Sequence, residues 1–413
     1  MGKTKSFGKI ELEDVKNAYK KVKRNGGAAG IDGQTIEKFE ENLESNLYKL
    51  WNRMASGCYF PSAVKRVEIP KDDGKTRPLG IPTVADRIAQ TVVKDKLEPM
   101  LEKIFHKDSY GYRPNKSAIV AIGVARERCW EYDWVIDLDI KGYFDNINHE
   151  LLMKAVEKHT DETWILKYTK RMIEAEVAMP NGERIKTGKG TPQGGVISPL
   201  LANLFLHYTF DKWVEKNELN IKFERYADDI VCHCKTKEEA DRLLELIKER
   251  MEECYLQLHP EKSKIVYCKD NRRKEEYKEN KINFLGYTFM ARDVQSHKGE
   301  RFLGYIPAMS DKAKKKFKQK IRDCKIIKVY ETRIEDIAEK INPILRGVIN
   351  YFKHYYKTEM KDIFYYMDKT LERWAMRKYK SLKGKKTAAA EFIKRIKKRQ
   401  PEMFEHWKFQ IAK

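Results

Sequence analysis

The strongest constraint on the fold is a pattern of aspartates within two segments that otherwise resemble buried strands. Residues 134–140, WVIDLDI, carry Asp137 and Asp139, and these side chains share one face because side chains in a strand alternate. Residues 223–231, FERYADDIV, place Asp228 and Asp229 together at a tight turn. Burying such charges without a partner costs several kcal/mol. The fold must therefore supply these carboxylates with water, a basic partner or a divalent cation.

Mg²⁺ is the cation that suits these carboxylates best. A few hard oxygen ligands, with room left for water and phosphate, favour Mg²⁺ over Ca²⁺ or Zn²⁺. Two such ions can activate an attacking oxygen and stabilise a leaving one in phosphoryl transfer. The residues alone do not separate Asp137 from Asp139. A single DD pair is more often an ordinary solvated turn, so the second pair carries much of the argument.

The charge of the chain indicates a polyanionic partner. Its 413 residues include 84 Lys and Arg against 62 Asp and Glu, a formal net charge of +22, which favours nucleic acid. An anionic membrane surface is the alternative, but there is no signal peptide and no run of about 18 apolar residues. We therefore expect a soluble, cytoplasmic protein that associates with RNA or the nucleoid. The seven cysteines contain no C-x-x-C pair, so neither a disulfide framework nor a zinc site is expected.

The hydrophobic periodicity predicts a mixture of helices and strands. Helices are expected within the first 60 residues and at 84–105, 117–131, 199–216 and 237–254. A hairpin is expected over 64–82, strands at 134–140 and 282–290, and a pair of strands about the turn within 223–234. From about residue 305 the chain becomes helical and more basic.

Several sequence blocks carry a resemblance to a known family. YADD resembles the signature of reverse transcriptases. The blocks IPKDDGKTRPLGIP, SYGYRPNKSA, DLDIKGYFDNINH, GTPQGGVISPLLANLFL and INFLGY resemble, in order, the motifs of proteins encoded by bacterial group II introns, and ILRGVINYFKHYY resembles their thumb. The resemblance covers nearly the whole chain. It implies an α+β fold of the right-hand polymerase type, with fingers, a palm built on an antiparallel sheet, and an α-helical thumb.

The resemblance also implies domain limits. Residues 1–62 would form an N-terminal extension and the start of the fingers, residues 63–300 the fingers and palm, and residues 301–413 the thumb or maturase region with basic C-terminal helices. A DNA endonuclease domain is not expected, because neither paired cysteines nor an H-N-H pattern follows the thumb.

The same resemblance assigns roles to individual residues. It gives the catalytic, metal-binding triad as Asp139, Asp228 and Asp229, and it prefers Asp139 to Asp137 because Asp139 lies five residues before Phe144. The backbone carbonyl of Ile140 is expected to contact one of two Mg²⁺ ions.

Nucleotide and nucleic-acid contacts follow from the same motifs. A cationic clamp should bind the triphosphate opposite the carboxylates, although basic residues on a hairpin are more often a solvated face. An aromatic ring under the incoming sugar would exclude a 2′-hydroxyl, although it could equally be a core residue. The implied nucleotide-binding residues are Lys71, Arg77, Phe144 and Gln193, and the implied template- and primer-binding residues are Arg113, Phe284, Leu285 and Gly286.

The implied function is RNA-directed DNA synthesis for a mobile group II intron, with maturase binding of the intron RNA to assist splicing and retrohoming. The expected partners are intron RNA, an RNA template, a DNA primer or target DNA, and dNTPs, with the protein a monomer or homodimer. Two alternatives remain: a reverse transcriptase of a retron or diversity-generating element, and a splicing-only RNA-binding maturase. The intact aspartates disfavour the second, and the QGGVISPLLAN and GIDG segments favour the intron class.

Overall fold

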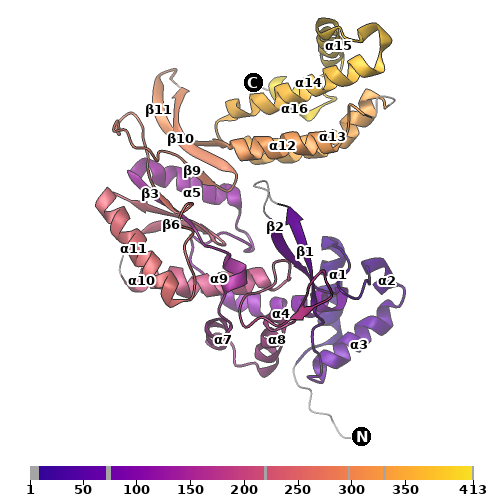
Figure 1. Cartoon of the computed structure of the whole chain (residues 1–413), viewed down its shortest axis with the longest axis vertical. Helices are drawn as coiled ribbons and strands as arrows, with labels where there is room; N and C mark the ends of the chain where they lie inside the picture. The colour runs from indigo at the N-terminus through magenta and orange to yellow at the C-terminus, as the bar shows by residue number, and fades with distance from the viewer. Residues whose placement is uncertain (1–8, 71–75, 218–220, 296–297, 329–331, 412–413) are drawn as a thin grey trace. The chain divides into compact units, whose positions relative to one another are not determined.

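The computed structural model describes residues 9–70, 76–217, 221–295, 298–328 and 332–411 (Figure 1). The chain divides into two compact units. The first comprises Met1–Ala121 and Leu138–Lys264, and the second comprises Ile122–Asp137 and Ile265–Lys413. The strands on either side of residue 300 pair with each other in the second unit, and the domain limits expected from the sequence stay predictions.

The N-terminal part of the first unit is helical, as the spacing predicted. Helix α1 (Leu12–Asn25) buries Val15, Ala18, Tyr19 and Val22 along one face. It packs on α3 (Leu43–Ala55) and α4 (Val84–Glu102), and the short α2 (Ile36–Glu40) lies beside α3 (Figure 1). Helix α4 begins where the Thr83 hydroxyl accepts a hydrogen bond from the Asp86 amide, a standard N-cap.

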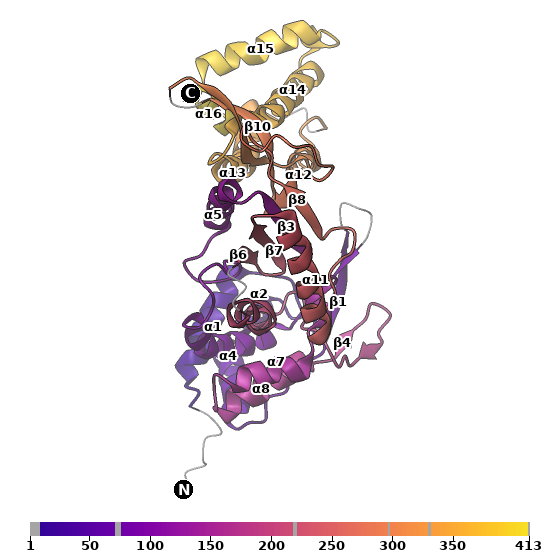
Figure 2. The ribbon, with the colours of Figure 1, turned by 90° about the vertical axis from the view of Figure 1, so that its left-hand side faces the viewer.

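The predicted hairpin at 64–82 is confirmed on both sides of its turn. Strands β1 (Val64–Pro70) and β2 (Thr76–Ile81) pair antiparallel, with Pro70 opposite Thr76. Two short strands, β4 (Val177–Ala178) and β5 (Arg184–Ile185), extend this sheet in the order β2-β1-β4-β5. Helices α6 (Tyr143–Asn146), α7 (His149–Glu157) and α8 (Thr163–Ile173) lie between these segments in sequence, and α7 packs against α8 (Figure 2).

A four-stranded sheet holds both aspartate-bearing segments. It comprises β3 (Trp134–Asp139), β6 (Lys222–Tyr226), β7 (Asp229–Cys234) and β8 (Lys264–Tyr267), in the order β6-β7-β3-β8. The antiparallel pair β6–β7 confirms the strands predicted about the YADD turn. Helix α9 (Ser198–Leu206) runs into a π-helical turn (His207–Asp211) and then α10 (Lys212–Lys216), while α11 (Lys237–Glu253) follows β7.

The second unit contains an antiparallel sheet that the sequence did not fully predict. Besides α5 (Ala118–Glu131), it has β9 (Ile282–Phe284), β10 (Tyr287–Gln295) and β11 (Arg301–Met309), in the order β11-β10-β9. The single strand expected at 282–290 is wrong, because Leu285 and Gly286 have φ angles of 50° and 81° and form a hairpin turn. The helical region expected from 305 begins instead at Asp311, after β11.

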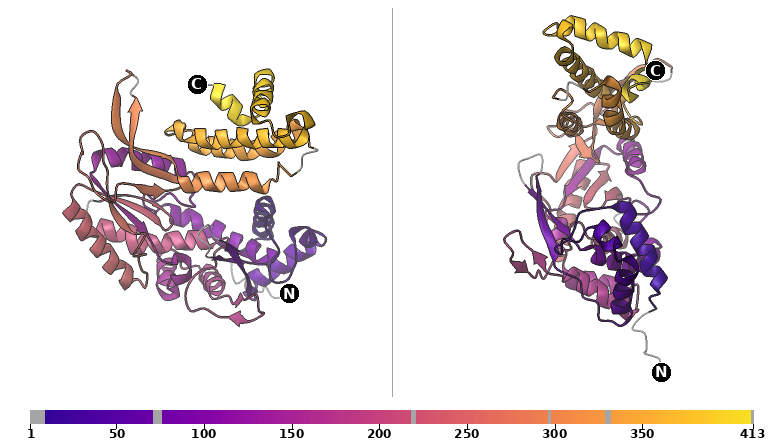
Figure 3. Two further views of the ribbon diagram at one scale, coloured as in Figure 1. Left: turned by 45° about the horizontal axis from the view of Figure 1, so that its top comes forward. Right: turned by 90° about the vertical axis from the view of Figure 1, so that its right-hand side faces the viewer.

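The remaining helices of the second unit bury a core of their own. They are α12 (Asp311–Asp323), α13 (Ile334–Phe352), α14 (Lys361–Lys378), α15 (Lys386–Arg399) and α16 (Glu405–Ile411), with 3₁₀ turns at Lys357–Met360 and Lys380–Leu382. Helix α14 packs on α12 and α15, and α13 packs on α16 (Figure 3). Trp374 and Trp407 are fully buried. Within the described ranges, no helix is long and apolar enough to cross a membrane.

Candidate active site

The YADD segment forms the connection of the β6–β7 hairpin. Tyr226 pairs with Asp229, which leaves Ala227 and Asp228 as a two-residue turn. Ala227 has a φ of 56°, a left-handed conformation that costs a non-glycine residue about 1–2 kcal/mol. The surrounding structure must therefore hold this turn, and the turn carries the Asp228 carboxyl at the end of the hairpin.

The segment SYGY packs directly against the turn. The Arg225 amide donates to the Asp108 carbonyl at 2.9 Å, and the Tyr110 amide donates to the Arg225 carbonyl at 2.8 Å. At Gly111, a Cβ would lie 2.5 Å from the Ala227 nitrogen. Only glycine allows this approach, so Gly111 fixes the backbone that precedes Asp228.

A buried ion pair anchors β6 beneath the turn. The Arg225 guanidinium donates to both carboxylate oxygens of Asp211, at 2.8 and 2.6 Å, and both side chains are 0% exposed. It also donates to Asn203 at 3.0 Å and to the Ala227 carbonyl at 3.4 Å. Asn203 in turn donates to the Gly111 carbonyl at 2.6 Å. This network links α9 and the π-helical turn to the SYGY segment and to the turn of the YADD hairpin.

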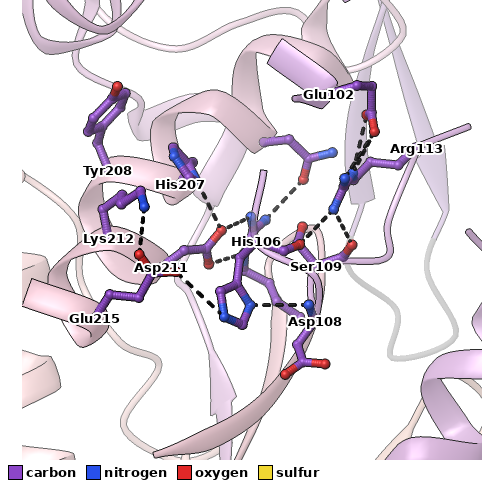
Figure 4. Close-up of polar contacts among 12 residues, drawn as sticks. Glu102, His106, Asp108, Ser109, Arg113, His207, Tyr208, Asp211, Lys212 and Glu215 are labelled. Carbon is purple, nitrogen blue, oxygen red and sulfur yellow. Dashed lines mark hydrogen bonds and ion pairs between the residues drawn. The ribbon is translucent and has the colours of Figure 1, made fainter. Parts of the chain in front are cut away.

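Asp211 is ionised in this network in spite of its burial. Figure 4 shows its carboxylate at the centre of the cluster, with His207 on the same helical stretch. Burial alone would raise the pKa of Asp211, but the charge of Arg225 and the neighbouring His207 outweigh it and lower the pKa below its ordinary value. At neutral pH the Asp211 carboxylate is therefore charged and forms an ion pair with Arg225.

The carboxylates of Asp139 and Asp228 influence each other. The pKa of Asp228 is raised, first by burial and then by the negative charge of Asp139, while Arg77 and Lys262 act in the opposite direction. The Lys262 ammonium lies 2.9 Å from the Asp139 carboxylate. Two acids close enough to repel, with an ammonium drawn to one of them, form a site that favours a cation.

The donor chemistry of this site fits Mg²⁺, which prefers carboxylate oxygens. In the part of the chain that the structure describes, however, no group of three or more His, Cys, Asp and Glu side chains is placed to hold a metal ion. The inclusion of Asp229 in a triad therefore stays a prediction. Two backbone hydrogen bonds join the segment around Ile140 to residues 257–259. The Lys141 amide donates to the Gln257 carbonyl, and the His259 amide donates to the Asp139 carbonyl. Neighbouring strand carbonyls point to opposite sides, so the Ile140 carbonyl is directed away from this segment.

Two of the predicted nucleotide-binding residues contact each other. The Arg77 Nε donates to the Gln193 side chain at 2.6 Å, and Gln193 lies 3.5 Å from the Asp145 carboxylate. Burial raises the pKa of Asp145, and the charges of Arg66 and Arg77 oppose that rise. Lys71 lies outside the described residues.

Phe144 lies beside the same loop. Its ring is 8% exposed and packs on Tyr143 with ring centroids 5.4 Å apart. Its carbonyl accepts a hydrogen bond from the Thr191 amide at 2.7 Å, which joins α6 to the GTPQGG segment. The structure thus places Phe144 and Gln193 on connected segments, and their nucleotide-binding roles stay predictions.

Sequence reasoning missed three polar residues of this site. Asp145 stands directly after Phe144 within the quoted GYFDN stretch, so attention to that motif could have found it. Arg66 and Lys262 carry no local signal for this site, because the aspartates on which they act, Asp145 and Asp139, are distant in sequence.

Arg113 has an environment that differs from the expected one. Its side chain is 6% exposed and pairs with Glu102 at 3.0 Å. It also donates to the His106 and Ser109 carbonyls, both at 2.7 Å (Figure 4). These contacts hold the loop before Gly111, and the template contact of Arg113 stays a prediction.

The predicted primer-contacting residues lie in the second unit. Phe284 is fully buried, so its side chain contributes to the core. The Leu285 carbonyl accepts from the Tyr351 hydroxyl at 2.8 Å, and the Gly286 carbonyl accepts from the Ser310 amide at 3.1 Å. Leu285 is partly exposed and Gly286 is exposed, and a primer contact at this turn stays a prediction.

Acidic side chains beside a hairpin turn, faced by Arg77 and Lys262, define a site suited to phosphoryl chemistry on a nucleotide. Comparison with known families specifies the class. Residues 69–289 match the family described as reverse transcriptase (RNA-dependent DNA polymerase), and residues 314–392 match the group II intron, maturase-specific domain. The chain belongs to the reverse transcriptase family and carries a group II intron maturase domain. The predicted class, an RNA-directed DNA polymerase of the group II intron type, is confirmed.

Individual relatives agree with this assignment. Protein YkfC of Escherichia coli is 34% identical over 278 residues, which cover 58% of this chain and 73% of that protein. The group II intron-encoded protein LtrA of Lactococcus lactis is 35% identical over 215 residues, covering 51% of this chain and 35% of LtrA. The putative COX1/OXI3 intron 1 protein of Saccharomyces cerevisiae is 30% identical over 198 residues, which cover 48% of this chain and 24% of that protein. The chain thus spans about a third or less of the two intron proteins.

Proposed function

We propose that the chain copies RNA into DNA at the site formed by Asp139 and Asp228, and that its maturase domain binds intron RNA to assist splicing and retrohoming. The observation that carries the proposal is the electrostatic coupling of these two carboxylates next to Arg77, in a chain of the reverse transcriptase family. Two Mg²⁺ ions held by Asp139, Asp228, Asp229 and the Ile140 carbonyl would activate the primer oxygen and stabilise the leaving group.

The remaining residues orient the substrates. The primer 3′-oxygen forms a bond to the α-phosphorus of a dNTP, and the bond to pyrophosphate breaks. Arg77, with Lys71, neutralises the triphosphate, as the charge on such a leaving group requires. Gln193, oriented by Arg77 at 2.6 Å, lies beside the new base pair, and the Phe144 ring excludes a 2′-hydroxyl. The partners are an RNA template, a DNA primer or target DNA, and dNTPs.

The architecture that we propose for this reaction is the right hand of a polymerase. The β6–β7 and β3 strands belong to the palm, the β1–β2 hairpin to the fingers, and the helices that follow β11 to the thumb. The proposed limits are 1–62 for the N-terminal extension, 63–300 for fingers and palm, and 301–413 for the thumb and maturase region. The state is a monomer or homodimer.

The proposal is tested by separating synthesis from RNA binding. Asp228→Ala should abolish extension of a primed RNA in Mg²⁺ while it leaves binding of a group II intron RNA intact. Asp241→Ala, an exposed aspartate on α11, is the matched control and should extend the primer as the unaltered chain does. Undiminished synthesis by Asp228→Ala would refute the catalytic assignment.

A splicing-only maturase is the second candidate function, because the maturase domain by itself implies RNA binding. It predicts intron binding without any primer extension by the unaltered chain. The presence of Asp139 and Asp228 in one electrostatically coupled site favours the polymerase, since RNA binding alone has no use for clustered negative charge.

A further inference from the structure

A hollow of about 670 Å³ in the second unit has the composition of a nucleotide site. Its walls include Arg126, Arg301, His354, Tyr355, Tyr356 and Lys357. Pockets of roughly 300–1,000 Å³ are typical of small-molecule and cofactor sites. The volume of the hollow lies within that range and suits a single nucleotide unit.

One of the lining residues is an arginine that lies over aromatic rings. The Arg126 guanidinium lies 4.2 Å from the Trp130 ring centroid and 5.7 Å from that of Tyr355. Its Nε is buried and has no hydrogen-bond acceptor among the described residues. Because this nitrogen is not accessible, a phosphate in the hollow would be bound by the rest of the guanidinium, which stacking already orients.

The aromatic wall is held in place before any ligand arrives. The Tyr355 hydroxyl lies 2.9 Å from the position that a Cβ would occupy at Gly123, so the absence of a side chain there admits the ring. Tyr356 has a positive φ of 21°, and its ring is covered by the Arg292 guanidinium at 5.5 Å. Rings fixed in this way provide a surface on which a nucleobase can stack at low entropic cost.

The charged side chains that line the hollow are mainly positive, which favours an anionic ligand. Arg126, Arg301 and Lys357 face one acidic residue, Asp293, whose backbone carbonyl accepts from the Tyr356 hydroxyl at 3.4 Å. Another large hollow, in the first unit, is lined by three glutamates and three lysines and has no Phe, Tyr or Trp. Positive charge and partly exposed aromatic rings thus occur together at the hollow of the second unit.

We infer that this hollow binds one unpaired nucleotide of an RNA strand, with its base stacked on the tyrosines and its phosphate bound by Arg126, Arg301 and Lys357. The inference rests on the proposed binding of intron RNA. Proteins recognise RNA mainly at unstacked bases in loops and bulges, which aromatic rings and arginines receive. The site lies outside the residues assigned to catalysis.

Photocrosslinking tests the assignment directly. A short RNA hairpin with one bulged 4-thiouridine, irradiated with the full chain, should crosslink within the peptide that contains Tyr355 and Tyr356. The double charge reversal Arg301→Glu, Lys357→Glu should lower the crosslink yield by about tenfold or more, because both side chains lose their charged hydrogen bonds and repel the phosphate instead. Reversal of two exposed lysines on α12, Lys315→Glu and Lys316→Glu, is the matched control and should lower it far less.

Equal losses in the two double variants, or crosslinks that map elsewhere, would overturn the inference. Competition by free uridine triphosphate at the RNA concentration would show that the hollow takes free nucleotides, and would overturn the assignment to a strand. Primer extension on a short primed template is measured in parallel. A chain that crosslinks at the tyrosines but extends no primer would contradict the polymerase activity alone.

Discussion

Asp211→Asn is the perturbation whose effect the structure specifies most closely. It preserves the shape of the side chain but leaves the Arg225 guanidinium charged and 0% exposed without a carboxylate. Removing one partner of a buried ion pair typically costs about 3–5 kcal/mol, because the other charge stays buried. We therefore expect the free energy of unfolding to fall by about that amount, measured by urea unfolding of the full chain followed by circular dichroism.

An exposed pair provides the comparison. Lys154 and Glu150 lie 2.7 Å apart, nearly the same distance, but their side chains are 63% and 76% exposed. Exposed pairs contribute about 0–1 kcal/mol, so Glu150→Gln should change the stability little. If Asp211→Asn destabilised the chain by no more than Glu150→Gln does, the role given to the buried pair would be refuted.

A double variant separates the charge from the shape. Asp211→Leu combined with Arg225→Met removes both charges, and such replacements are often neutral or stabilising. The double variant should therefore be more stable than Asp211→Asn. It also removes the hydrogen bond from Arg225 to the Ala227 carbonyl at 3.4 Å. We expect a folded protein whose primer extension is reduced, since the turn that carries Asp228 has lost one of its anchors.

The remaining predictions concern sugar selection, the turn and pH. Phe144→Val should increase incorporation of ribonucleotides by opening space beneath the sugar, and unchanged selectivity in single-nucleotide extension would contradict that role. Gly111→Ala should greatly reduce primer extension because its Cβ would meet the Ala227 nitrogen at 2.5 Å, whereas Gly188→Ala, with open space around it, should not. Because the pKa of Asp211 is lowered on folding, its stabilisation is present above the ordinary aspartate pKa of about 4 and is lost as the pH falls below it. The stability difference between the unaltered chain and Asp211→Asn should shrink in that acidic range.

Periodicity predicted most of the fold. The alternation at 64–70 and 76–81 and the apolar spacing of α1 are local signals, and both elements formed as expected. The strand expected at 282–290 was wrong because its apolar residues continue through the turn, and only the positive φ values of Leu285 and Gly286 reveal a hairpin. The π-helical turn that carries Asp211 has no sequence signal, since its neighbours continue the helical pattern on both sides.

Residues of the candidate site could be named from the sequence only where they stand within a recognisable motif. Arg77 and Gln193 were named from separate blocks, and the structure joins them at 2.6 Å. Arg113 was named as a template contact from its motif, and only the structure shows that it pairs with Glu102 and donates to two carbonyls. Its template role stays a prediction. Lys262 was missed because it reaches Asp139 across 123 residues of sequence, and a long-range contact of this kind leaves no local pattern.

Primer extension by the unaltered chain decides whether the protein copies RNA into DNA. A DNA primer annealed to an RNA template is incubated with dNTPs and Mg²⁺, and the same primer on a DNA template of identical sequence serves as the comparison. The proposed function predicts full-length product on the RNA template, lost in Asp228→Ala and retained in Asp241→Ala. Absence of product on the RNA template from a folded chain that binds it would contradict the account.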